Sequence, residues 1–187
     1  MKLLRLSFGL FLLCAFLFPG PQAYALSITP DSPYLLLTGA QTGVPEIEAA
    51  ITAYLGYDIN ELYKQDVGAA SDVGALSGSY ETEFSNEPDD PSAATISYVS
   101  GPTVGDPAYL LVKDGNQDPA WYFFGLTGWN GMETLYLTDF WPKQGAISHV
   151  ALYGETAPVP EPATMLLLGT GLLGLAGVSR KKLKKQQ

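Results

Sequence analysis

An uncharged apolar segment near the C-terminus places the strongest constraint on this 187-residue chain. Residues 163–179 carry no charged side chain, and a basic cluster follows at residues 180–185. As a helix rising ~1.5 Å per residue, the segment would be roughly 25 Å long, against a hydrocarbon core of about 30 Å. We therefore predict a transmembrane helix over 163–179 that spans a bilayer only marginally.

The N-terminus has the three parts of a secretory signal. Lys2 and Arg5 precede an apolar run, and Ala23 and Ala25 form a small-residue cleavage site after it. We predict a signal peptide over residues 1–25 that signal peptidase removes by cutting after Ala25.

The acidic residues occupy the middle of the chain and most basic residues its two ends. All nineteen carboxylates lie between Asp31 and Glu161, where only three of the ten basic residues are found. By the positive-inside rule both basic ends stay in the cytoplasm, which places the acidic middle on the opposite side of the membrane. Such a body is repelled by phosphate, so nucleic-acid binding is excluded. Cys14, the single cysteine, lies in the predicted signal peptide, so the mature domain would hold no thiol.

The segment before the C-terminal apolar run has a distinctive order. Pro160, Glu161 and Pro162 precede a glycine-rich apolar span, and the basic cluster follows it. This ordered triple resembles the PEP-CTERM sorting signal of Gram-negative bacteria that make exopolysaccharide. We assign residues 158–187 to this signal and residues 26–157 to the exported domain.

The resemblance implies recognition by an exosortase, an integral membrane cysteine transpeptidase that removes the tail. It also implies a precursor in the inner membrane, with its domain outside the cytoplasm, and a mature form at the cell surface or secreted. Independently of the resemblance, Pro160 and Pro162 favour an extended, exposed segment beside the membrane, as a processing enzyme needs.

Short apolar segments separated by glycine, proline, asparagine and serine predict a mainly-β domain, a β-sandwich of the jelly-roll type with one short helix. Residues 76–85 alternate strictly with a period of two, between one set that would face the core and a polar set, and this marks the clearest strand. The other predicted strands cover residues 34–38, 94–99, 108–113, 120–126, 133–139 and 146–153.

The helix is predicted to begin at Pro45 and to end at Gly56, because proline suits the first helical turn and glycine the end. Its buried face would consist of Ile47, Ile51, Tyr54 and Leu55. Residues 58–64 are predicted to add a short turn of helix, and residues 86–92 an exposed loop.

The stretch from Tyr109 to Gly154 resembles the domain often attached to PEP-CTERM tails. That resemblance implies a β-rich extracellular module, and no activity comes with it. The residues that carry it include Asp118-Pro119-Ala120-Trp121-Tyr122, Trp129-Asn130-Gly131 and Phe140-Trp141-Pro142.

Asp114, Asn116 and Asp118 alternate as oxygen ligands do at the start of a calcium loop. An EF-hand would next need glycine, and glutamate at its twelfth position, where this chain has Pro119 and Gly125. A hairpin turn explains the same three residues. We favour the turn and keep a Ca²⁺ site as the alternative; no other cofactor is expected.

Trp121, Trp129 and Trp141 are candidates for stacking against sugar rings. Buried aromatic side chains are nevertheless common in β-sandwich cores, since each covers roughly 150–250 Å². We expect two of the three tryptophans in the core.

Catalytic groups are sparse in the sequence. His149 is the only histidine, which excludes sites that need two, and its neighbour Ser148 is expected on the opposite face of a strand. Glu81 and Glu83 share one strand face and are interpreted as solvated. We therefore expect no enzyme.

The functional hypothesis is an exported cell-surface or matrix protein with a structural or interaction role. The alternative is a carbohydrate-binding module for exopolysaccharide, assisted by calcium. A hydrolase of matrix polymers ranks third.

Overall fold

The computed structural model describes residues 25–85, 89–115, 117–142, 145–158 and 169–172. Most of the predicted signal peptide, the Pro160–Pro162 segment, the basic tail and Asn116 lie outside these residues. Of the predicted transmembrane segment, only residues 169–172 are described, and they are helical. Within the described part of the chain, no helix has the length and apolar character needed to cross a membrane.

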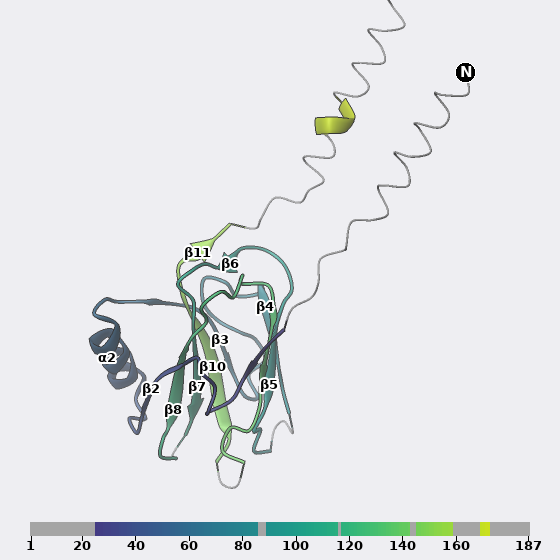
Figure 1. Ribbon diagram of the computed structural model, residues 1–187. Coiled ribbons are helices and arrows are strands. Elements are labelled where there is room, and N and C mark those ends of the chain that lie inside the picture. The colour runs from purple at the N-terminus through teal and green to yellow at the C-terminus, as the bar shows by residue number, and fades with distance from the viewer. Residues whose placement is uncertain (1–24, 86–88, 116, 143–144, 159–168, 173–187) are drawn as a thin grey trace, which may run out of the picture.

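The domain is mainly β and consists of two larger sheets and a small one (Figure 1). The four-stranded sheet has the order β1 (Ala25–Ile28), β9 (Thr134–Leu137), β5 (Ala94–Tyr98) and β4 (Tyr80–Phe84). The five-stranded sheet has the order β2 (Leu35–Gly39), β8 (Trp121–Gly125), β7 (Tyr109–Asp114), β10 (Ile147–Gly154) and β3 (Asn60–Asp66). The small sheet pairs β6 (Thr103–Val104) with β11 (Thr156–Ala157).

The main core lies between the two larger sheets, which makes the domain a two-layer sandwich. Leu110 and Phe124 of the five-stranded sheet share one buried cluster with Tyr80, Ile96 and Leu135 of the other. Alternate residues of a strand face opposite sides. Burial of such apolar surface is the main favourable term in folding.

The helix α2 (Val44–Leu55) covers the outer face of the five-stranded sheet, beside β2 and β8 in Figure 1. Ile47 and Ile51 join a second buried cluster with Leu111 and Phe123, which lie on the sheet face turned away from the main core. Strand β7 is therefore buried on both faces.

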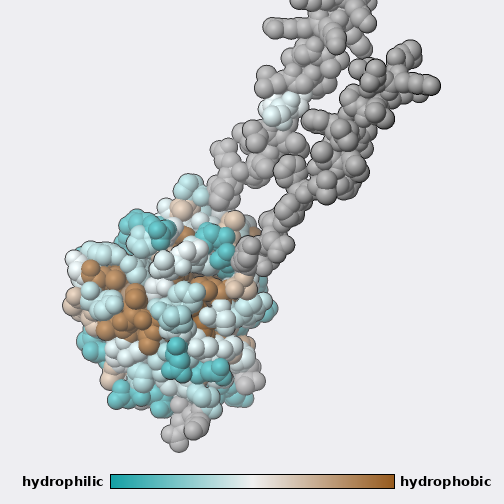
Figure 2. Space-filling model, viewed as in Figure 1, coloured by the Kyte–Doolittle hydropathy of each residue, from teal (hydrophilic) through white to brown (hydrophobic). Residues whose placement is uncertain are grey.

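The helix has the predicted ends but a narrower buried face. It ends at Gly56, which adopts the left-handed conformation with φ of 80°. Tyr54, predicted in the buried face, is 50% exposed, because α2 packs through Ile47 and Ile51. Hydrophobic surface on this side of the domain is visible as brown in Figure 2.

Three elements differ from the sequence-based expectations. Residues 58–64, predicted as a helical turn, lead into β3, because pairing with β10 supplies the hydrogen bonds that a helix would have made locally. The strand predicted from residue 76 starts at Tyr80; the preceding segment is a turn in which Gly78 has a φ of 76°. Strand β1 pairs in parallel with β9, unlike the antiparallel strands of a jelly roll.

Candidate functional site

The regular structure of the domain extends to within a few residues of the Pro160–Pro162 segment. Strand β11 pairs with β6, and the Gly105 N–H donates to the Glu155 carbonyl over 2.7 Å. Only Pro158 and Val159 separate β11 from Pro160. The segment predicted for sorting thus begins immediately after a paired strand.

A buried tyrosine anchors β6 to the rest of the domain. The Val104 N–H donates to the Tyr80 hydroxyl oxygen over 2.9 Å, and that hydroxyl donates to the Gly131 carbonyl over 2.8 Å. Burial raises the pKa of Tyr80 to about 12, so the hydroxyl keeps the proton that it donates. Strand β11, the last strand before the sorting segment, is therefore connected to the core through β6 and Tyr80.

All three candidate tryptophans are buried, against the expectation that one would be exposed. Trp121, Trp129 and Trp141 are 1%, 6% and 9% exposed. Trp129 and Trp141 belong to the core between the two sheets, and Trp121 belongs to the cluster under α2, where large aromatic side chains bury much apolar surface. None of them therefore forms an exposed stacking platform. Trp141 is one of the residues that line a cavity.

Of the three candidate calcium ligands, the structure describes Asp114 and Asp118. Asp114 is 3% exposed, and its carboxylate accepts hydrogen bonds from the backbone N–H groups of Gln117, at 3.2 Å, and Ala146, at 2.6 Å. Asp118 is exposed and lines a cavity, and Asn116 lies outside the described residues. No group of three or more potential metal-binding side chains occurs in the described part of the chain. Asp114 thus organises a turn.

His149 is a buried residue of β10, and its ring contacts two neighbours through the same nitrogen. Its Nδ1 lies 3.5 Å from the Ser148 hydroxyl and 3.5 Å from an Asp66 carboxylate oxygen. The register of β10 shifts between Ile147 and His149, so Ser148 is not held on the opposite face as expected. Both contacts of the ring, with Ser148 and with Asp66, are made by Nδ1.

Protonation of His149 is unfavourable in the folded domain. Burial and the nearby Lys64 ammonium lower its pKa to about 4, although Asp66 acts in the other direction. The imidazole is therefore neutral near pH 7, and its contact with Asp66 is not an ion pair there. Glu81 and Glu83 are exposed on β4.

We expect His149 to make the domain less stable in acid. The unfolded chain binds the proton below about pH 6.5, whereas the folded domain excludes it until about pH 4. The free energy of unfolding should fall across this window by up to about 3 kcal/mol from this group alone. Urea unfolding at pH 7.0 and pH 4.5 should show a smaller loss in His149→Gln than in the wild type. Equal losses in both proteins would contradict the assignment.

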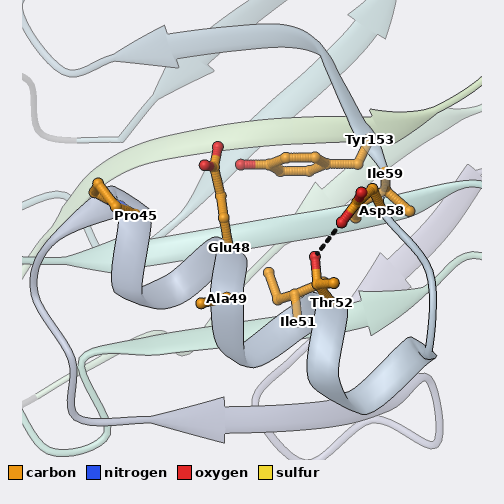
Figure 3. A pocket seen from close by; sticks show the side chains of 8 residues that line it. All are labelled: Pro45, Glu48, Ala49, Ile51, Thr52, Asp58, Ile59 and Tyr153. Carbon is orange, nitrogen blue, oxygen red and sulfur yellow. Dashed lines mark hydrogen bonds between the residues drawn. The ribbon is translucent and has the colours of Figure 1, made fainter.

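A pocket of about 440 Å³ lies between α2 and the sheet, and Figure 3 shows its side chains. It is lined by Pro45, Glu48, Ala49, Ile51, Thr52, Asp58, Ile59 and Tyr153. The Thr52 hydroxyl donates to the Asp58 carboxylate over 3.2 Å. The carboxylate of Glu48 points toward the Tyr153 ring and its hydroxyl.

Tyr153 and Glu61 form a hydrogen-bonded pair beside this pocket. The Tyr153 hydroxyl donates to Glu61 Oε2 over 3.2 Å. Burial, followed by the charge of Glu61, raises the pKa of Tyr153, and burial also raises the pKa of Glu61. The Tyr153 hydroxyl therefore keeps the proton that it donates, and this hydrogen bond links β10 to β3.

The sequence alone gave no indication of this pair. Tyr153 and Glu61 lie far apart in the chain and meet only because β10 and β3 pair in the register that sets them opposite each other. The lining of the pocket likewise combines a helix, a loop and the last long strand.

Comparison with known proteins gives one match, at the C-terminal end. Residues 158–181 match the family model of the PEP-CTERM protein-sorting motif. No curated protein and no solved structure matches the chain. The matched residues include Pro160, Glu161 and Pro162 and start directly after β11. The chain is therefore a protein with a PEP-CTERM sorting motif, which implies a membrane-anchored precursor that an exosortase processes to a surface or extracellular form.

Proposed function

We propose that the mature protein is a non-enzymatic component of the cell surface or extracellular matrix, with a structural or interaction role. The observation that carries the proposal is the position of the sorting motif, which starts directly after the last strand of the β-sandwich. Removal of the tail at this point would release a domain that keeps β11 and its pairing with β6.

The hydrogen bonds of several polar side chains support a structural role. Asp114 accepts backbone hydrogen bonds, Glu61 pairs with Tyr153, and Tyr80 links β6 to Gly131. Each of these groups holds one segment of the domain to another. Their hydrogen bonds stabilise the fold of a protein that must persist outside the cell.

The charge of the domain supports an interaction role. Of its lysines, Lys64 pairs with Asp66 over 3.1 Å, and the Lys113 ammonium donates to the Asp114 carbonyl over 2.8 Å. Carboxylates therefore dominate the exposed charge of the described domain. An acidic surface favours cationic partners through electrostatic complementarity.

Fractionation of cells that produce the full chain tests this proposal. We expect the domain in the surface or extracellular fraction, with a mass lower than that of the full chain. Retention of all the protein in the cytoplasm or inner membrane would contradict it. Antibodies against the domain distinguish these outcomes without knowledge of a ligand.

A further inference from the structure

The first and the last strand of the domain begin and finish at the same end of the sandwich. Strand β11 directly follows β10 and lies with β6 at one end in Figure 1. Strand β1 begins at Ala25, which is paired with Thr134, the first residue of β9. The Tyr80 hydroxyl links the two places, because it bonds to Val104 of β6 and to Gly131, just before β9. We call this end the β11 end; it includes the connections before β3, after β5 and before β9.

The sorting motif keeps the β11 end close to the membrane in the anchored precursor. Five residues, 158–162, separate β11 from the apolar segment that starts at residue 163. Even when fully extended, five residues span at most roughly 18 Å, and the headgroup layer takes roughly 5–8 Å of this length. The end of β11 therefore lies within about 13 Å of the bilayer surface.

Two exposed apolar side chains lie at the β11 end of the four-stranded sheet. Val99 is 56% exposed and Met132 is 39% exposed. Strands β5 and β9 are antiparallel with Ile96 opposite Leu135, and continuing this register by three residues sets Val99 opposite Met132. The two side chains therefore form a small apolar patch on the rim of the domain.

The five-stranded sheet contributes an aromatic side chain to the same end. Tyr57 is 47% exposed, and its hydroxyl is hydrogen-bonded to the Tyr109 hydroxyl. Tyr109 is paired with Tyr153, one residue before the end of β10. Tyrosine is enriched at membrane–water interfaces, because it combines an apolar ring with a polar group. The β11 end thus exposes apolar or aromatic surface from both sheets.

The opposite end of the sandwich is marked by exposed carboxylates. Asp31, Asp118 and Asp139 line a cavity there, where the connections after β1, before β8 and after β9 meet. Carboxylates are repelled by anionic lipid. The β11 end also holds exposed carboxylates, among them those of Asp106 and Glu155, so its own attraction to a bilayer is weak.

We propose that in the anchored precursor the β11 end faces the bilayer, with Val99 and Met132 in contact with the boundary between lipid headgroups and acyl chains. The contact depends on the tether, because covalent attachment supplies a high effective concentration of membrane surface in place of intrinsic affinity. The region from Asp31 to Glu161 has nineteen carboxylates and three lysines, so a domain without its tail is repelled by anionic lipid. Removal of the tail therefore also ends the membrane contact.

This inference goes beyond the role proposed for the mature protein, since it concerns the precursor. It rests on the membrane anchor that the sorting motif implies. A β11 end held against the bilayer keeps the Pro160–Pro162 segment at the membrane surface. An exosortase is a membrane enzyme, so this is the place where its substrate has to be presented.

Fluorescence quenching by labelled lipids tests the proposal on the full chain. The chain is purified from cells that lack an exosortase and is placed in phosphatidylcholine vesicles, with or without lipid that carries a nitroxide at the headgroup–acyl boundary. Val99→Cys or Met132→Cys, each in a Cys14→Ala background, carries an NBD fluorophore. We expect the nitroxide lipid to lower the emission of both labels at least about twofold, because contact places them at its depth. Both positions are exposed, so the substitutions should leave the fold intact.

Val44→Cys is the matched control, because Val44 is also an exposed valine, at 40%. It follows β2, whose last residue, Gly39, is paired with Trp121 at the opposite end of the sandwich. We expect its emission to be nearly unaffected. Equal quenching of all three labels would overturn the orientation. Absence of quenching at Val99→Cys and Met132→Cys would overturn the membrane contact and assign the patch to a protein partner.

The processed Val99→Cys and Met132→Cys proteins, recovered from the cell surface, test the role of the tether. With the same vesicles, we expect them to lose most of the quenching. Quenching as strong as that of the full chain would overturn the dependence on the tether. Cell fractionation reports the location of the mature protein independently, so a failure of this inference is distinguishable from a failure of the proposed function.

Discussion

Alanine at Pro160, Glu161 and Pro162 is expected to leave nearly all of the protein as an unprocessed precursor in the membrane fraction. These residues lie within the matched sorting motif, and the two prolines favour the extended conformation that a processing enzyme can bind. The apolar segment and the basic tail remain intact in this variant. Immunoblots of membrane and surface fractions, with antibodies against the domain, measure the effect.

The matched control for this variant replaces residues of the same types inside the domain. Pro33→Ala, Glu83→Ala and Pro102→Ala change three exposed positions. This control should be processed like the wild type. Processing of the motif variant at the wild-type level would contradict the role of the motif.

Phe124→Ala is expected to destabilise the domain by about 3–5 kcal/mol, because it leaves a large cavity in the core between the sheets. Phe124 is 0% exposed, and its ring contacts that of Phe140 at 6.0 Å between centroids. Urea unfolding of the processed protein measures the change in the free energy of unfolding. Such a loss is a large part of the total stability of a small domain.

Tyr136→Ala on the neighbouring sheet provides the control. Tyr136 is 46% exposed, and its loss should change the free energy of unfolding by about 0.5 kcal/mol or less. Similar effects of the two substitutions would contradict the placement of the core between the sheets.

The strands that the sequence predicted best are those whose patterns reflect burial. Strands β7, β8 and β10 lie in the interior of the five-stranded sheet, so their apolar runs end close to the predicted positions. Helix α2 was also predictable, because Pro45 and Gly56 mark its ends locally. In each case the signal lies within a few neighbouring residues.

The elements that the sequence missed depend on distant partners. Strand β3 forms because it pairs with β10, and β1 because it pairs with β9. The two-residue strands β6 and β11 are too short to give a pattern of alternation. Pairing of this kind is decided by tertiary contacts, which outweigh local preference.

The same difference between local signals and distant contacts applies to the candidate sites. The sorting motif could be identified from the sequence because an extended segment is read residue by residue. The cavity at Trp141 required the structure, since three separate connections supply its lining. Asp118, which the sequence analysis assigned to a turn with a calcium site as the alternative, lies at that cavity beside Pro119 and Tyr122.

Mass spectrometry of the protein recovered from the cell surface tests the central claim most directly. Sorting through the PEP-CTERM motif predicts a mature chain that keeps the domain through β11 and lacks the apolar segment 163–179 and the basic tail. A surface protein whose chain is intact to Gln187 would contradict it.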